Sequence, residues 1–360
     1  MAYSEIKDPS AHFQTLLYTG NGSNLTVTND GNSDLKPDFV WTKCRSGTSH
    51  HTIVDSTRGA GQQLYPNLAS QGQEAVNGVS AFLTNGFSLG SNGTANSSAA
   101  TYVAWQWKAN GGTTVSNTDG NITTTVQANP TAGFSLVFYT GNGVQTGKTV
   151  GHGLGAVPKM IISKDRDATS NVGTWRVYHE GIGNTKYLEL QSTAGQSTFN
   201  DWDNTTPTSS VYSVGGAGGY TPTNTSNTEY IAYVFADVQG YSKFGSYVGN
   251  GNPDGAFVYT GFKPAFVMVK KTNEATNWEM FDHKRNPSNV ANLKLGANLA
   301  VGDNGSDLGT TSQNNIDMLS NGFKMRTANT DTNVSGSPYI YMAFAENPFV
   351  TSTGVPTTAR

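Results

Sequence analysis

One series of phrases occurs three times along the chain, and this internal repeat constrains the fold more than any single residue. The copies open with YTGNG at Tyr18–Gly22, YTGNG at Tyr139–Gly143 and YVGNG at Tyr247–Gly251. A proline-led strand phrase follows each opening, at Pro37, Pro158 and Pro264. Three copies of one unit at a period of about 110 residues predict an array of like domains, not one large enzyme.

Three further phrases recur in the same order within each copy. They are IVDSTRG, VYHEGIG and MFDHKRN; then GFSLG, VYSVG and GFKMR; and last YVAWQWKA, YIAYVFAD and YIYMAFAE. Asp55, His179 and Asp282 occupy matching positions in the first of these sets. A catalytic residue has no reason to recur as Asp, His and Asp, so we interpret the position as a polar strand end.

Composition and periodicity both favour short strands. Charged residues make up 13% of the 360 residues and hydrophobic residues 36%, while glycine occurs 42 times. Gly, Asn and Thr suit tight turns and half-buried strands. Phe39 and Trp41 alternate with Val40 and Thr42, and no window of twelve residues keeps a helical period. We predict an all-β protein of three tandem antiparallel β-sandwich modules, jelly-roll or lectin-like, each closing its own hydrophobic interior.

The repeat boundaries predict the domain organisation. We expect an N-terminal arm at 1–12, repeat 1 at 13–109, a polar flexible linker at 110–133, repeat 2 at 134–239, repeat 3 at 240–348 and a C-terminal tail at 349–360. Repeats 2 and 3 join without a spacer, so that junction should be the more rigid one.

Charge and hydropathy exclude several functional classes. The net charge is −3 and the basic residues are scattered, so no nucleic-acid-binding stripe is expected. The longest apolar runs are strand-length, which predicts no membrane insertion. No signal peptide is visible at the start. The single cysteine, Cys44, lies in a strand and is expected to be a quiet thiol.

Residues for catalysis or metal binding are sparse. The six histidines form no ligand pair at helical spacing, and His50 and His51 should point to opposite faces of a strand. Asp201 and Asp203 flank Trp202 and could serve as a glycosidase pair, but a turn is the favoured interpretation. Asn29–Asp34 and Gly302–Asp307 bear a faint likeness to calcium loops and lack the closing Glu. We predict no enzyme and no cofactor, with Ca²⁺ as the one candidate ion.

Aromatic residues are the remaining functional candidates. Trp175 and Trp278 share one repeat position, and Trp105 and Trp107 share one strand face, so all four should pack in the core; Trp202 and Tyr220, by contrast, have no counterpart in the other repeats and lie in polar, glycine-rich loops. These two are the predicted ligand-binding residues, stacking on a bound ligand.

The phrases together resemble a known family. YTGNG, VGHGLG, GYSKFGSYVGNG and the C-terminal YIYMAFAENPFVTSTGVPTTAR look like those of triplicated β-sandwich proteins encoded by tailed bacteriophages, especially marine ones. The resemblance covers nearly the whole chain. It implies a virion structural or tail-fibre-like protein, and it carries no catalytic residues over to this sequence.

The expected function follows from the resemblance and the composition. We expect a non-enzymatic virion surface protein, made in the host cytoplasm, that acts as a tail-fibre or receptor-binding component toward the host envelope, with host glycans as candidate ligands. A capsid decoration or cement protein is the alternative, and a polysaccharide depolymerase is the remote one. The arm and tail are expected to bind other virion proteins, and a homotrimer is expected by analogy with fibres.

Overall fold

The structure, a computed structural model, describes residues 4–70, 72–75, 77–167, 173–303, 315–328, 331–350 and 353–357. Within these residues the helices are limited to α1 (Gly93–Asn96) and the 3₁₀ turns η1 (Pro9–Ala11) and η2 (Glu180–Ile182). The pairings between named strands are antiparallel. The prediction of an all-β, antiparallel fold is confirmed.

Repeat 1 forms one large and one small sheet. The large sheet has the order β1 (Phe13–Thr19), β9 (Thr101–Trp107), β3 (Phe39–Cys44), β4 (Thr52–Asp55), β5 (Gln62–Leu64) and β6 (Gln73–Glu74). The small sheet has the order β2 (Leu25–Thr28), β8 (Gly86–Leu89) and β7 (Val79–Leu83).

The other two repeats are built in the same way. The large sheet of repeat 2 runs β10 (Val115–Asn117), β11 (Thr124–Asn129), β12 (Phe134–Thr140), β19 (Glu229–Phe235), β14 (Met160–Asp165), β15 (Trp175–His179), β16 (Lys186–Glu189) and β17 (Ser197–Thr198), and β13 (Lys148–Gly151) pairs with β18 (Val211–Val214). In repeat 3 the large sheet runs β20 (Ser242–Val248), β27 (Pro338–Pro348), β22 (Phe262–Lys271), β23 (Trp278–Asp282) and β24 (Leu295–Gly296), and the small one β21 (Phe257–Tyr259), β26 (Gly322–Met325) and β25 (Ile316–Leu319). The jelly-roll or lectin-like topology stays a prediction.

The opening phrase makes the same two contacts in each repeat: a stacked tyrosine pair and an asparagine hydrogen bond. Its tyrosine stacks on the first tyrosine of the last strand, with ring centroids 4.9–5.0 Å apart and planes within 9°, in the pairs Tyr18–Tyr102, Tyr139–Tyr230 and Tyr247–Tyr339. A buried asparagine just before that strand accepts the backbone N–H of the phrase's own asparagine, as Asn96 does from Asn21. Asn224 and Asn333 repeat this contact with Asn142 and Asn250. The phrase therefore fastens the first strand of each repeat to its last.

Each large sheet is buried on both faces. One face packs on the small sheet of the same repeat and forms a local core; Val40, Ile161 and Val267 belong to these three cores. The alternate residues, such as Trp41, Ile162 and Phe266, point to the opposite face. This alternation is the period-2 pattern of a strand.

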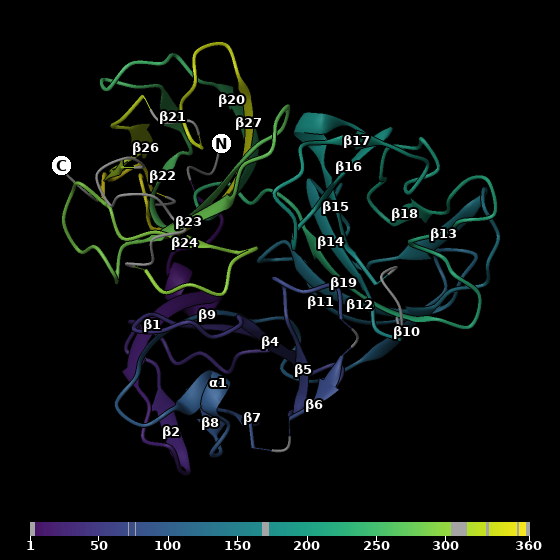
Figure 1. Cartoon of the computed structure of the whole chain (residues 1–360), viewed down its shortest axis with the longest axis horizontal. Coiled ribbons are helices and arrows are strands. Elements are labelled where there is room, and N and C mark those ends of the chain that lie inside the picture. Colours follow the sequence, from purple (N-terminus) through teal and green to yellow (C-terminus); the bar gives the residue numbers. More distant parts are fainter. Residues whose placement is uncertain are drawn as a thin grey trace.

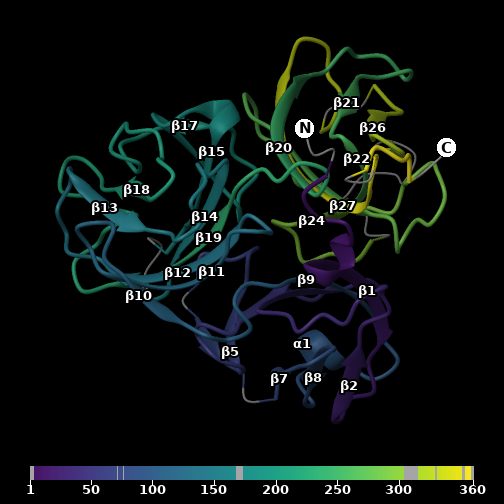
Figure 2. The same cartoon turned by 180° about the vertical axis from the view of Figure 1, so that it is seen from behind.

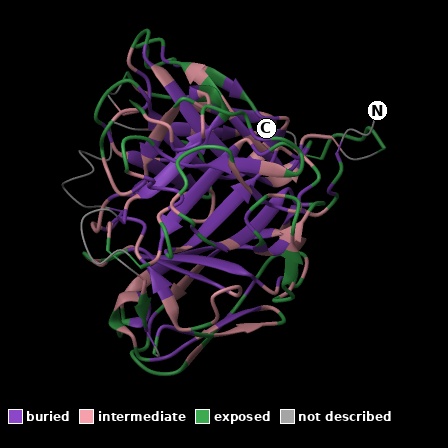
Figure 3. Ribbon diagram, turned by 90° about the vertical axis from the view of Figure 1, so that its right-hand side faces the viewer, coloured by how far each residue is buried: buried purple, intermediate pink, exposed green. Residues whose placement is uncertain are grey.

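The opposite faces meet in one shared core, which corrects the prediction of three separate interiors. A single cluster of buried residues contains Trp41, Trp105 and Trp107 of repeat 1, Phe134 and Trp175 of repeat 2, and Phe266, Trp278 and Phe344 of repeat 3. Figures 1 and 2 show the three groups of sheets around a common centre, and Figure 3 shows the buried strands in the interior with exposed loops outside. Because a sheet needs a cover on each apolar face, each repeat uses the other two as its second cover.

The predicted flexible linker at 110–133 is wrong. It contains β10 and β11, and β11 pairs with β12 over five residues, from Thr125–Phe138 to Asn129–Phe134. Val126 is buried in the local core of repeat 2. The polar segment is thus the outer part of the large sheet of repeat 2.

The described part of the N-terminal arm packs on its own chain. Ile6 belongs to the shared core, and the Glu5 N–H donates to the Gln239 carbonyl oxygen where repeats 2 and 3 join. Residues 4–12 therefore pack on other parts of this chain, and binding of the arm to other virion proteins stays a prediction. In the tail, Phe349 N–H donates to Gly261 O, and Val350 bridges to Pro356. No helix in the described residues has the length and apolarity needed to cross a membrane.

Candidate functional site

Three fully buried lysines tie the repeats together in a ring. Lys43, Lys164 and Lys270 occupy the same position of the proline-led strand. Each ammonium donates to a backbone carbonyl of another repeat: Lys43 to Ala300 (2.9 Å), Lys164 to Ala69 (3.3 Å) and Lys270 to Thr193 (3.0 Å). Repeat 1 thus holds repeat 3, repeat 3 holds repeat 2, and repeat 2 holds repeat 1.

The side chain opposite each lysine on the neighbouring strand also donates a hydrogen bond to a backbone carbonyl of another repeat, and it joins the same two repeats as the lysine does. Trp175 Nε1 donates to Tyr65 O (3.0 Å) and Leu68 O (3.1 Å), and Trp278 Nε1 donates to Glu189 O (3.0 Å). In repeat 1 the register of the strands puts His51 at the matching position. Its Nδ1 accepts from Trp41 Nε1, so Nε2 donates to Gly296 O (2.9 Å). Burial lowers the pKa of His51 well below its ordinary value, which keeps the ring neutral. The prediction that Trp175 and Trp278 are core residues is confirmed.

Two buried Asp–Arg pairs also connect the repeats. The aspartate of repeat 1 binds a side chain of repeat 2, and the aspartate of repeat 3 binds a side chain of repeat 1. Asp55 Oδ2 lies 2.5 Å from Arg58 Nε and accepts the Tyr233 hydroxyl of repeat 2 (2.9 Å). Asp282 Oδ2 lies 2.6 Å from Arg285 Nε and accepts Trp105 Nε1 of repeat 1 (3.2 Å). Tyr233 and Trp105 are at the same position of the last strand, so each carboxylate meets a polar aromatic donor.

The interface between repeats 2 and 3 has a different residue at each of these three positions: the aspartate, the arginine and the aromatic donor. The last strand of repeat 3 has Met342 at the aromatic position, which offers no N–H or O–H donor. Facing it, repeat 2 has His179 in place of the aspartate and Ile182 in place of the arginine. His179 accepts from Gly181 at Nδ1, so its Nε2 donates to Tyr341 O (3.1 Å). Burial lowers the pKa of His179 to about 4, so the position that holds an Asp–Arg pair in the other two repeats is uncharged here.

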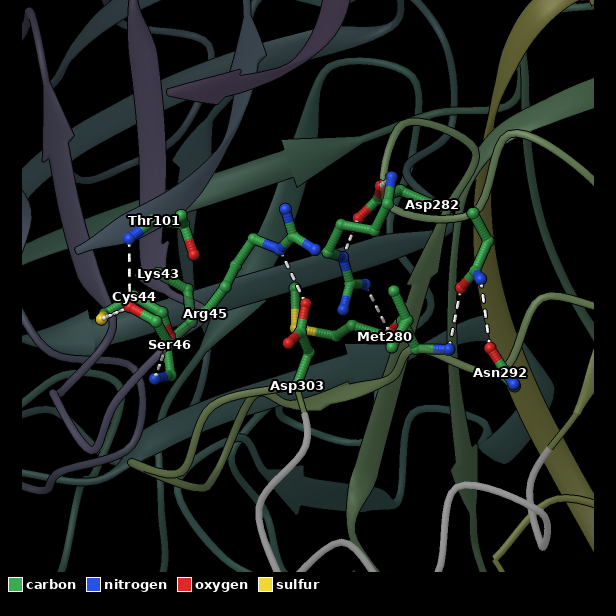
Figure 4. A network of polar contacts seen from close by, with 12 residues as sticks. Lys43, Cys44, Arg45, Ser46, Thr101, Met280, Asp282, Asn292 and Asp303 are labelled. Atoms are coloured by element: carbon green, nitrogen blue, oxygen red, sulfur yellow. Dashed lines mark hydrogen bonds and ion pairs between the residues drawn. The ribbon is translucent and has the colours of Figure 1, made fainter. Parts of the chain in front are cut away.

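An ion pair with a backbone hydrogen bond also joins repeats 1 and 3 at the edge of their interface (Figure 4). Arg45 Nε donates to Asp303 Oδ2 at 2.7 Å, and Asp303 N–H donates back to Arg45 O at 3.1 Å. Cys44, beside them, is buried, as expected of a quiet thiol. The titratable groups gathered here hold two repeats in place.

Burial lowers the pKa of Lys43, Lys164 and Lys270 to about 8. Between pH 8 and the ordinary value of 10.5, each of these lysines therefore binds more protons in the unfolded chain than in the folded protein. The lysines make stability rise with pH from about pH 8, by at most about 1.4 kcal/mol per pH unit each. Buried tyrosines such as Tyr139, Tyr233 and Tyr247, whose pKa burial raises, oppose this rise as the pH approaches their ordinary value of 10.

We accordingly expect the free energy of unfolding to increase between pH 8 and pH 9 in urea titrations, below the range in which tyrosines of the unfolded chain ionise. Lys270→Met should flatten the increase, because methionine removes one of the three buried ammonium groups; the partly exposed Lys284→Met is the matched control. A stability that is constant or falls over this range in the wild-type protein would contradict the assignment.

The prediction for Trp202 is wrong, because its ring is 1% exposed and cannot stack on a ligand. It packs in the local core of repeat 2 against Tyr178, with ring centroids 5.8 Å apart. The DWD segment forms a turn, as favoured, with positive φ at Asp203 (48°) and Asn204 (47°). The turn carries the indole from a polar loop into the interior.

Tyr220 is half-buried in a small cluster at the edge of the same repeat. Its hydroxyl accepts from Arg176 Nη2 (3.2 Å), and its ring lies 5.7 Å from that of Phe199. The Arg176 guanidinium also lies over the Tyr187 ring (4.0 Å) and pairs with Glu189 (3.1 Å). A role of Tyr220 in ligand binding stays a prediction.

The carboxylates Asp201 and Asp203 do not form a paired acid and base. Asp201 is fully buried, 3.6 Å from Arg176 Nε, and burial raises its pKa to about 6. Asp203 accepts the Gly147 backbone N–H at 2.6 Å. The two side chains therefore bind different parts of the repeat.

The other polar residues that the sequence analysis singled out have partners within the protein. His51 is buried and His50 exposed, in agreement with opposite faces. His152 is buried between Leu154 N–H and Thr208 O. In the first calcium-like loop, Asp30 pairs with Lys284 at 2.8 Å, while 304–307 of the second loop lie outside the described residues. No group of three potential metal ligands occurs among the residues that the structure describes.

Two grooves lie at junctions of the repeats. One, of about 290 Å³, separates repeats 1 and 3 and is lined by polar residues that include Gln14, Asp30, His283 and Lys284. The other, of about 540 Å³, lies where the arm, the junction of repeats 2 and 3, and the start of the tail meet.

The interface lysines were not predicted from the sequence. The signal was present, because PDFVWTK, PKMIISK and PAFVMVK all end in lysine. A charged residue at a matching position of three otherwise apolar strands is a sign of a buried polar contact.

The sequence profile of a family described as "Domain of unknown function (DUF7483)" matches residues 8–348. Neither the curated proteins nor the solved structures contain a significant match to the chain.

Proposed function

We propose that this chain, which belongs to the DUF7483 family, is a non-catalytic structural protein on the outer surface of a bacteriophage particle. In this proposal it is part of a tail fibre or receptor-binding assembly and presents loops toward the host envelope.

The observation that carries the proposal is the closed ring of contacts among the three repeats. Seven buried titratable groups each bind a different repeat and so have a structural role: the three lysines, His51, His179, Asp55 and Asp282. A particle surface protein needs such a rigid body with many outward loops, and several weak sites on one body add through avidity.

The resemblance to triplicated phage proteins supports the same proposal from the sequence side. The low content of charged residues, 13%, and the abundance of Gly, Asn and Thr loops agree with an outward-facing display surface.

The test is to locate the protein on the particle. Particles of the phage that encodes the chain would be labelled with an antibody raised against the purified protein and viewed by electron microscopy. We expect label at the tail or its fibres. Label confined to the capsid would replace the proposal by a decoration role, and particles without label or peptides of this protein would contradict both.

A further inference from the structure

Two aromatic side chains of repeat 3 stand out on the protein surface. Phe257 is 47% exposed and Tyr259 is 61% exposed, while Val258 between them is buried at 6%. Alternate residues of a strand point to one face, so both rings lie on the outer face of β21, in the small sheet of repeat 3 (Figure 1).

The fold does not require aromatic residues at these positions. Val27 of β2, Val150 of β13 and Val258 of β21 pair with Phe87, Tyr212 and Phe323 on the neighbouring strand and fill equivalent places. The residues on either side are Thr26 and Thr28 in repeat 1, Thr149 and Gly151 in repeat 2, and Phe257 and Tyr259 in repeat 3. Two repeats fold with small residues here, so packing of the small sheet does not explain the rings of the third.

Glycines lie beneath both rings. A Cβ added at Gly322 would come within 3.2 Å of Phe257 Cε2, and one at Gly261 would lie 3.6 Å from the Tyr259 hydroxyl oxygen. Without side chains at these two positions, the rings can lie flat against the sheet and expose their faces.

The larger groove begins at Tyr259. Its volume is about 540 Å³, within the range of small-molecule sites. Its lining adds Thr260, Gln239 and the side chains of Glu5, Asp237 and Lys243. Asp237 and Lys243 neutralise each other at 2.5 Å, which leaves Glu5 as the only unpaired formal charge among these residues.

We propose that Phe257, Tyr259 and this groove form a binding site for a neutral oligosaccharide. The C–H face of a sugar ring is apolar and packs on an exposed aromatic face, and its hydroxyl groups bind amides, carboxylates and hydroxyls of the kinds that line the groove. A phosphate-bearing ligand is disfavoured, because the described residues that line the groove include no unpaired cation to receive it.

This inference deepens the proposed function by naming a ligand class for the display surface. The test uses the full-length protein and an array of immobilised neutral linear tetrasaccharides of glucose, galactose, mannose and N-acetylglucosamine. We expect binding to at least one of them, and about a tenfold loss of affinity in Tyr259→Ala or Phe257→Ala. Thr28→Ala, the same position in repeat 1, should keep full affinity.

Both aromatic side chains are exposed, so the variants should melt at the wild-type temperature, and this is checked first. The inference is overturned if none of the four sugars binds at millimolar concentration, if Tyr259→Ala binds as the wild type does, or if an extended peptide binds this groove in their place. Particle labelling is independent of these results, so a failed sugar site and a failed virion assignment can be told apart.

Discussion

Replacing Trp107 by alanine is expected to lower the free energy of unfolding by about 3–5 kcal/mol. The ring is 1% exposed and lies in the shared core. It contacts Phe13 of its own repeat (4.9 Å between ring centroids), Phe235 of repeat 2 (6.5 Å) and Phe344 of repeat 3 (5.4 Å). For a protein of this length the loss corresponds to a fall in Tm of about 5 °C.

The distribution of the effect separates a shared core from three local ones. Native-state hydrogen exchange should become faster in the large sheets of all three repeats in Trp107→Ala, because the cavity is bordered by each of them. Trp107→Phe, which keeps a ring, should lose less stability. A change restricted to the strands of 13–109 would contradict the shared core.

Removing the Asp282 carboxylate is expected to destabilise the protein by about 3–5 kcal/mol. Asp282→Ala leaves the Arg285 guanidinium buried without its partner and Trp105 Nε1 without its acceptor. Both side chains of the ion pair are 0% exposed, so water cannot replace the lost carboxylate without structural change. Denaturant unfolding measures the loss.

The double variant Asp282→Ala/Arg285→Met provides the control. It removes both charges, as repeat 2 does naturally with His179 and Ile182, so it should be more stable than Asp282→Ala alone. A double variant with a lower free energy of unfolding than Asp282→Ala would show that the two charges do not stabilise the protein as a pair, and it would contradict the prediction.

The strand pattern and the repeat could be predicted from the sequence because both are local signals. Phe39 and Trp41 alternate with Val40 as expected, and the tyrosine of each opening phrase marks the first strand. The shared core was missed although its sign is visible: the phrase YIAYVFA from Tyr230 is apolar on both faces of a strand, and one small sheet can cover only one of them.

The errors at the candidate site have separate physical causes. The strands of 110–133 were missed because threonine and asparagine at a sheet edge look like a linker, and few of the residues, among them Ile122, Val126 and Ala132, are apolar side chains of a core. Trp202 was misplaced because a polar turn carries its indole into the core, and the other repeats have no matching tryptophan to reveal it. Tyr259 was missed because Phe257, Val258 and Tyr259 are apolar in sequence, as the residues of a buried strand are, so nothing local marks two of them as exposed.

Differential scanning calorimetry of the intact chain tests whether the three repeats are one folding unit. If they close a single core between them, the protein unfolds in one transition whose calorimetric enthalpy equals its van't Hoff enthalpy. Two or three separate transitions, each carrying its own share of the enthalpy, would show that the repeats fold independently and would contradict the shared core.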